Sequence, residues 1–191
     1  MNRPVKLLMH VCCGPCAVLP VKRFMSDRNI ELAAVFYNPN IHPIDELERR
    51  KEGALTVAES FGVPLTVYDD CFQEMWEEFE EKSKDGPGEP CPGDEGRCLM
   101  CYRIRLAFVA RKAKEESFDA FTTSLLISPY QNHDLIKEIG YQMQSEYGVK
   151  FHYEDFRPEF REGQKTARDM GVYRQKYCGC IISYRNMLQK S

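Results

Sequence analysis

A short apolar run that ends in three cysteines constrains the fold of this chain more than any other stretch. The run covers residues 5–11 and leads directly into Cys12-Cys13-Gly14-Pro15-Cys16. An apolar run bounded by Gly and Pro is typical of a strand buried inside a parallel sheet. We therefore expect a buried strand at residues 5–11, with the three thiols in the loop that leaves its carboxyl end.

Strand and helix patterns alternate along the rest of the chain. The other strand candidates are residues 31–37, 63–68, 118–126 and 149–153. Helices are expected after the first cysteine loop, over residues 45–60, 72–84, 98–116 and 133–145, and in most of the Arg-rich remainder except around residues 177–180. Pro20 fits only if it falls in the first turn of its helix. This order predicts one α/β domain over residues 1–191, with a Rossmann-like parallel sheet flanked by helices and a helical C-terminal part.

The grouping of the nine cysteines indicates metal or redox chemistry. The groups are Cys12, Cys13 and Cys16, then Cys98 and Cys101, then Cys178 and Cys180, with Cys71 and Cys91 outside them. No signal-peptide pattern is present, and no apolar run reaches the roughly 20 residues that cross a bilayer. We therefore expect a cytoplasmic protein without a membrane partner. Reducing conditions there disfavour structural disulfides, so cysteine groups more often bind metals or carry out catalysis.

Four of these cysteines can meet at one edge of the expected sheet. In open parallel sheets, ligands bind where loops leave the carboxyl ends of the strands. Cys98 and Cys101 lie three residues apart, on one face of their helix, and the segment before them can reach that edge. Together with two thiolates of the loop that begins at Cys12 they predict a [4Fe–4S] cluster. A structural zinc site is the alternative, although adjacent cysteines are unlike the C-x₂₋₄-C spacing of zinc knuckles.

The remaining candidate residues leave several roles open. Cys178-Gly179-Cys180 can be a ligand pair for a second metal, a reducible dithiol, or two incidental thiols. Cys16 can bind a second metal or stay a buried thiol. His133, close to Tyr130 in the expected loop of residues 127–133, is the best candidate proton donor, with a packed core histidine as the alternative.

Charge is distributed unevenly along the chain. The formal net charge is −3, but bases clearly outnumber acids between Arg157 and Lys190. A local basic surface can bind phosphates even when the whole protein is acidic, although a solvated helix face is an equally ordinary explanation. The sequence contains no G-x-G-x-x-G and no P-loop, so nucleotide cofactor chemistry is not expected.

Six motifs together resemble one known family. They are HVCCGPC from His10, YNPNIHP from Tyr37, RCLMCYRIRL from Arg97, FDAFTTSLLISPY from Phe118, FRPEFREG from Phe156 and YRQKYCGC from Tyr173. The chain resembles the QueH type of epoxyqueuosine reductase. The resemblance implies a fold similar to the adenine-nucleotide alpha-hydrolase and PP-loop group. It also implies cobalamin-independent removal of the epoxide oxygen from epoxyqueuosine in tRNA, the last step of queuosine synthesis.

The resemblance also implies roles for particular residues. The [4Fe–4S] ligands would be Cys12, Cys13, Cys98 and Cys101. Cys178 and Cys180 would form a redox-active disulfide or bind a second, mononuclear iron that Cys16 could also reach. Tyr130 or His133 would supply a proton.

The expected partners follow from this activity. They are tRNA with epoxyqueuosine in its anticodon loop and an electron donor such as ferredoxin or flavodoxin. The alternatives are an iron–sulfur thiol–disulfide or electron-transfer module without tRNA dependence, and a zinc-stabilised tRNA-binding protein without catalysis.

Overall fold

A five-stranded parallel sheet forms the centre of the protein. The computed structural model describes residues 3–69 and 95–189. Among these residues the strands are β1 (Val5–Val11), β2 (Ile30–Tyr37), β3 (Leu65–Tyr68), β4 (Ala120–Thr123) and β5 (Lys150–Phe151). Their order is β3-β2-β1-β4-β5, and every pair is parallel. The expected Rossmann-like α/β sheet is confirmed, whereas the helix expected over residues 72–84 lies outside the described part, as do Cys71 and Cys91.

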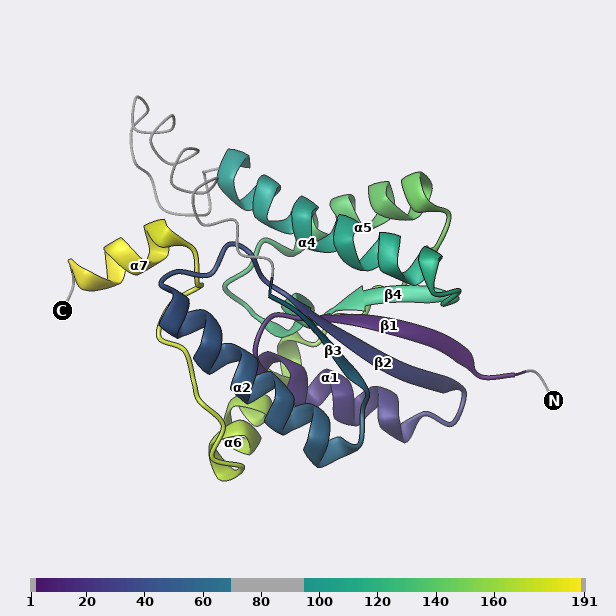
Figure 1. The fold of residues 1–191 in the computed structure, drawn as a ribbon, viewed down its shortest axis with the longest axis horizontal. Helices are drawn as coiled ribbons and strands as arrows, with labels where there is room; N and C mark the ends of the chain where they lie inside the picture. The colour runs from purple at the N-terminus through teal and green to yellow at the C-terminus, as the bar shows by residue number, and fades with distance from the viewer. Residues whose placement is uncertain (1–2, 70–94, 190–191) are drawn as a thin grey trace.

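Helices cover both faces of the sheet (Figure 1). They are α1 (Gly14–Ser26), α2 (Ile44–Phe61), α4 (Glu95–Glu115), α5 (His133–Tyr147), α6 (Phe160–Asp169) and α7 (Ile181–Leu188), with 3-10 turns η1 (Ser124–Ile127) and η2 (Arg157–Glu159). Helices α4 and α5 lie on one face and α1 and α2 on the other, while α7 projects from the body. None of the described helices is long and apolar enough to cross a membrane.

Burial on both faces explains why the central strands are almost continuously apolar. Leu7, Leu8 and Met9 of β1 are at most 1 % exposed, and all four residues of β4 are buried. Burial of one such side chain contributes roughly 1.5–3 kcal/mol. On the lower face in Figure 1, α1 and α2 pack closely, since a Cβ on Gly14 would lie only 2.5 Å from the carbonyl oxygen of Gly53. This contact fixes the start of α1, directly after the first cysteines.

Two expected strands are shorter than their apolar patterns. The strand expected over residues 118–126 ends at Thr123, because Ser124–Ile127 forms the 3-10 turn η1 and the Thr123 hydroxyl accepts a hydrogen bond from the Leu125 amide at its start. The strand expected over residues 149–153 is reduced to Lys150–Phe151. In both places apolar residues continue beyond the ladder because they still face the core.

Two helix expectations were also wrong. Helix α1 begins at Gly14, within the expected cysteine loop, so that Pro20 lies in the helix interior and not in its first turn. Pro20 has no amide hydrogen, and the carbonyl of Cys16 therefore lacks the usual partner four residues later. Between α6 and α7, irregular backbone extends over residues 170–180, longer than expected, beginning where Gly171 adopts φ 71°.

The strand order creates a crevice at one edge of the sheet. The chain moves from β1 to β2 on one side, and β4 pairs with β1 on the other, so the direction switches between β1 and β4. Ligands of open α/β sheets bind at the carboxyl ends of the strands at such a switch point. Cys12 follows β1 and Ser124 follows β4 at this position.

Candidate metal and redox centre

Three buried thiols lie together at the switch point. The sulfur atoms of Cys12, Cys13 and Cys16 are all within 4.8 Å of one another, with 3.7 Å between Cys12 and Cys13. Cys13 is the N-cap of α1, and Cys16 lies in its first turn. The positive end of the helix dipole and the unpaired amides of a first turn favour thiolates at this place.

Hydrogen bonds to one of the three sulfurs, that of Cys12, stabilise its thiolate form. Ser124 donates its hydroxyl to Cys12 Sγ over 3.3 Å and accepts the Cys12 amide over 3.0 Å, which ties the ends of β1 and β4 together. Hydrogen bonds from Cys13, then Cys16, then Ser124 hold the pKa of Cys12 well below its usual value. Burial raises the pKa of Cys13 to about 12, and the hydrogen bond to Cys12 raises the pKa of Cys16 well above its usual value. The triad therefore carries one negative charge most easily.

The second group of cysteines reaches the centre from α4. Cys101 is buried, and Arg105, one helical turn later, donates from Nη2 to its sulfur. Arg105 is itself 3 % exposed, and although burial opposes its charge, the sulfurs of Cys101 and then Cys12 raise its pKa. One guanidinium thus lies between the two groups. Cys98 is also buried, at 8 % exposure, but takes part in a disulfide, whereas the other six described cysteines are free thiols.

The third group is held in place by a buried arginine. Arg50 of α2 donates from Nη1 and Nη2 to the carbonyls of Cys178 and Tyr177, each over 2.9 Å, and from Nε to Glu46 over 2.8 Å. The Arg50 and Glu46 side chains are only 3 % and 4 % exposed. Gly179 has φ 121°, and a Cβ there would lie 2.8 Å from Arg50 Nη1. We call Glu46, Arg50 and the two carbonyls the arginine clamp.

Within this group the two thiols differ in acidity. The hydrogen bond from Cys180 lowers the pKa of Cys178 to about 6, against a usual value of 9.0. The same bond raises the pKa of Cys180, with burial acting in the same direction. Cys178 is exposed and Cys180 buried, and the Gln131 amide lies 3.6 Å from Cys178 Sγ. Cys178 is therefore the reactive member of the pair.

A cavity of about 450 Å³ opens between these groups. Cys12, Cys16 and Cys178 line it, which places sulfur from two of the three groups in one space. Four cationic side chains also line it, and no acidic residue does so within the described part of the chain; the cations are Arg50, Arg105, Arg174 and Lys176. Such a wall favours a negatively charged ligand.

The two expected proton donors occupy different positions. Tyr130 lines the cavity and is 81 % exposed. His133 is buried at the first position of α5, with Nε2 3.2 Å from the carbonyl of Ser128 and Nδ1 without a described partner, and it does not line the cavity. Burial lowers the pKa of His133. His10 of β1 is also buried, and burial lowers its pKa to about 4, so it remains neutral.

Several residues of the site were missed from the sequence. Arg105 follows Cys101 by one helical turn, so helical spacing could have found it. Gln175 lies in the YRQKYCGC motif and donates to Cys13 Sγ over 3.0 Å. Arg50 has no such signal, because its partner Cys178 is 128 residues away.

The sequence is similar to one described family over most of its length. The sequence matches the family described as Epoxyqueuosine reductase QueH over residues 7–186. The Epoxyqueuosine reductase QueH of Thermotoga maritima is 33 % identical, over 96 % of this chain and 93 % of that protein. The corresponding protein of Acinetobacter baylyi is 34 % identical, over 95 % of this chain and 81 % of that protein.

Solved structures show the same fold. The U34-tRNA thiolase NcsA from Methanococcus maripaludis, solved with its [4Fe-4S] cluster, superposes with a TM-score of 0.56 at 16 % identity. The superposition covers 99 % of this chain and 65 % of that one.

Fold and site together define a Rossmann-like α/β protein with cysteines gathered at the switch point of its parallel sheet. Within that class, the chain belongs to the QueH family of epoxyqueuosine reductases. Its reaction removes the epoxide oxygen from epoxyqueuosine in tRNA and yields queuosine.

Proposed function

We propose that this chain reduces epoxyqueuosine without cobalamin, through a [4Fe–4S] cluster held by Cys12, Cys13, Cys98 and Cys101. The observation that carries the proposal is the buried thiol triad that shares Arg105 with Cys101. Soft thiolates select iron–sulfur clusters or zinc, and the adjacent pair Cys12-Cys13 favours the cluster. Cys98 has to be reduced before it can act as a ligand.

The residues present fit such a group. Cluster sulfurs and cysteine ligands need hydrogen-bond donors around them, since these donors tune the reduction potential. Ser124, Gln175 and Arg105 each donate to a cysteine sulfur here. The Gln175 side-chain oxygen, by contrast, is buried without a described partner. When bound, a [4Fe–4S] cluster transfers electrons one at a time.

The reaction itself needs two electrons. Both C–O bonds of the epoxide break, a C=C bond forms and the oxygen leaves as water, which consumes two electrons and two protons. Oxidation of the Cys178 and Cys180 thiols to a disulfide releases two electrons and two protons, so the pair balances one turnover. The acidic thiol of Cys178, exposed in the cavity, is the member placed to meet substrate.

A second metal is the alternative use of these sulfurs. Cys16 and Cys178 both line the cavity, and a mononuclear iron bound there would be a Lewis acid for the departing oxygen. Tyr130 or His133 would supply a proton in either case, and only Tyr130 lines the cavity.

The cationic mouth of the cavity supports tRNA as the substrate that enters it. Arg174 and Lys176 are exposed on the irregular segment before Cys178. They can bind phosphates that flank an unpaired anticodon nucleotide. Moving the base of such a nucleotide into a cavity costs less free energy than extracting a paired base from a duplex. The dithiol or cluster then needs an external low-potential donor, for which ferredoxin or flavodoxin is suited.

Anaerobic reconstitution with iron and sulfide tests the proposal. The protein is first reduced, then assayed for iron, labile sulfide and conversion of epoxyqueuosine tRNA to queuosine tRNA with a low-potential reductant. Cys101→Ala is expected to lose most of the iron and all activity, whereas Cys178→Ala keeps the cluster and loses turnover. A colourless protein that holds zinc and no sulfide would contradict the cluster. A loaded protein that reduces disulfides but never forms queuosine would favour the electron-transfer module.

A further inference from the structure

One aromatic side chain at the mouth of the cavity is almost entirely exposed. Tyr130 is 81 % exposed, the largest value among the exposed large hydrophobic residues of the described chain. Its ring contacts Phe160 in a T-shaped arrangement, with centroids 5.7 Å apart and an interplanar angle of 84°. Both residues line the cavity. Two adjacent aromatic rings beside polar side chains at a cavity mouth are typical of a ligand-binding groove.

The hydroxyl of Tyr130 differs from those of the other tyrosines around the site. The other tyrosines around the site each donate to the protein, Tyr102 to Gln131, Tyr173 to Glu46 and Tyr177 to the carbonyl of His42. No hydrogen bond of the Tyr130 hydroxyl to another described residue is present. The ring, and not the hydroxyl, is therefore the part that the site presents.

The backbone that carries Tyr130 is well fixed. The Tyr130 amide donates to the Ser128 hydroxyl over 3.3 Å, and the Gln131 amide to the Ser128 carbonyl over 3.3 Å. Two residues later, Asn132 caps α5 and donates its amide to the Tyr102 hydroxyl. A ring on a rigid segment loses little conformational entropy when a ligand stacks on it.

Tyr130 is also next to the reactive thiol and the cations. Its neighbour Gln131 places its side-chain nitrogen 3.6 Å from Cys178 Sγ. Arg174 and Lys176 line the same cavity. A base lying on the Tyr130 ring would thus have phosphate-binding cations beside it, and a substituent on that base would point to the sulfur end of the cavity.

We propose that Tyr130 is a stacking platform for the modified base of the target nucleotide, which stays at the cavity mouth while its epoxide-bearing substituent enters toward Cys178. Single-stranded nucleotides are recognised in this way, by stacking on aromatic rings flanked by cations. The inference rests on the proposed function, since it names the part of that site that binds the base. It gives the ring a binding role that does not depend on the phenol proton.

Three variants of the iron-loaded protein test the assignment. Tyr130→Phe keeps the ring, Tyr130→Leu removes it, and Tyr141→Leu is the control. Tyr141 is also exposed, at 43 %, and makes a T-shaped contact with Phe151, but it lies on α5 and does not line the cavity. Each variant is assayed for KM and kcat with epoxyqueuosine tRNA, and for equilibrium tRNA binding by filter retention.

We expect Tyr130→Leu to raise both KM and the tRNA Kd by about 10-fold, the effect of losing one base–aromatic stack. Tyr130→Phe keeps the ring, so its tRNA Kd should stay within about twofold of the parent, a change of less than 0.5 kcal/mol by the usual conversion. Tyr141→Leu should leave both KM and Kd within the same twofold. A tRNA Kd raised as much in Tyr130→Phe as in Tyr130→Leu would show that the hydroxyl, and not the ring, binds the base, and would overturn the proposal. Unchanged binding in Tyr130→Leu would overturn it too.

Failure of this inference is distinguishable from failure of the proposed function. The iron content and melting temperature of all three variants should equal those of the parent, because the exposed ring contributes little to folding. If the loaded parent forms no queuosine, the proposed function fails whatever the variants bind. If the parent is active and Tyr130→Leu is equally active at low tRNA concentration, only the stacking role fails.

Discussion

Among single residues, Cys178 and Cys180 show how one hydrogen bond separates two chemically identical groups. Cys180 is buried and keeps its proton, and that proton stabilises the thiolate of exposed Cys178. Because a thiolate is the nucleophile in both thiol exchange and alkylation, the difference is measurable without substrate.

Alkylation of the metal-free, reduced protein should therefore be fastest at Cys178. The rate with iodoacetamide is expected to rise with pH through a midpoint near the pKa of about 6 and to level off above it. In Cys180→Ala the donor is lost, so the midpoint should move up, toward the usual thiol value of 9.0. Peptide mass spectrometry at each pH measures both midpoints. Equal midpoints in the two proteins would show that Cys180 does not control the acidity.

At the level of elements, the arginine clamp joins α2 to the segment that carries Cys178. Arg50→Met would leave Glu46 buried without its guanidinium, and the carbonyls of Tyr177 and Cys178 without donors. Breaking a buried pair costs about 3–5 kcal/mol, so we expect a loss of that size in the free energy of unfolding by chemical denaturation.

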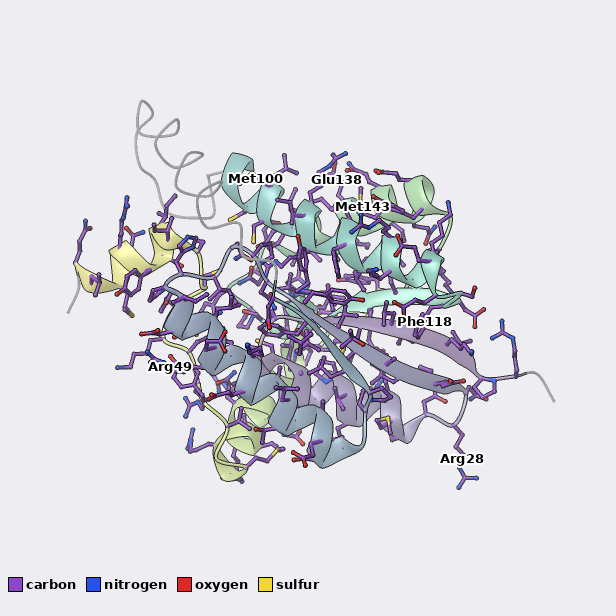
Figure 2. The ribbon with its side chains drawn as sticks, viewed as in Figure 1. Arg28, Arg49, Met100, Phe118, Glu138 and Met143 are labelled. Carbon is purple, nitrogen blue, oxygen red and sulfur yellow. The ribbon has the colours of Figure 1, made fainter. Side chains whose placement is uncertain are left out.

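A neighbouring arginine provides the control for the clamp. Arg49, labelled on α2 in Figure 2, is exposed and lies over the ring of Tyr173, 5.6 Å from its centroid. Arg49→Met should cost only about 0.5–1 kcal/mol, as expected for an exposed cation–π contact. Comparable losses in the two variants would argue against the clamp.

The contact between α1 and α2 positions the first cysteines. Gly14→Ala places a Cβ 2.5 Å from Gly53 O and 2.6 Å from Val172 Cγ1, so α1 has to shift. We expect a destabilisation of about 1–3 kcal/mol and a reduced iron content, because Cys13 and Cys16 flank Gly14. Gly62→Ala, at φ 67° with nothing within 4 Å of the added Cβ, is the comparison. It should destabilise α2 without loss of iron, and equal iron loss would contradict the positioning role.

For the whole molecule, the formal net charge is −3, although the mouth of the cavity is cationic. Affinity for tRNA should fall steeply with salt, and each phosphate contact to a single strand contributes about −0.7 to the slope of log K against log salt. Arg174→Ala and Lys176→Ala are each expected to reduce that slope by about this amount. Arg28, which points outward near the opposite, N-terminal end of the strands (Figure 2), serves as the control. If Arg28→Ala reduced the slope as much as Arg174→Ala and Lys176→Ala do, tRNA binding at the cavity mouth would be contradicted.

Features of the fold and site that depend on local sequence patterns could be predicted, whereas those that depend on contacts between residues far apart in the chain could not. The parallel sheet covered by helices followed from apolar runs, because strands buried on both faces are apolar throughout. The end of β4 did not, since Ser124–Ile127 is as apolar as the strand before it and Ser124 accepts the Cys12 amide from 112 residues away. Likewise the cysteine groups were visible, whereas Arg50 acts on a carbonyl 128 residues away and leaves no local pattern.

The proposed site is assembled from segments that are far apart in the sequence. These segments are residues 12–16, 98–101 and 175–180, and they meet only in the folded chain. A ribosome makes these segments in that order, so a nascent chain exposes the first thiols to water long before Gln175 covers Cys13. A cluster assembled on these thiols during translation would be exposed to solvent and prone to oxidation. Maturation of the proposed cluster is therefore expected only after Gln175 has been synthesised and has packed against Cys13.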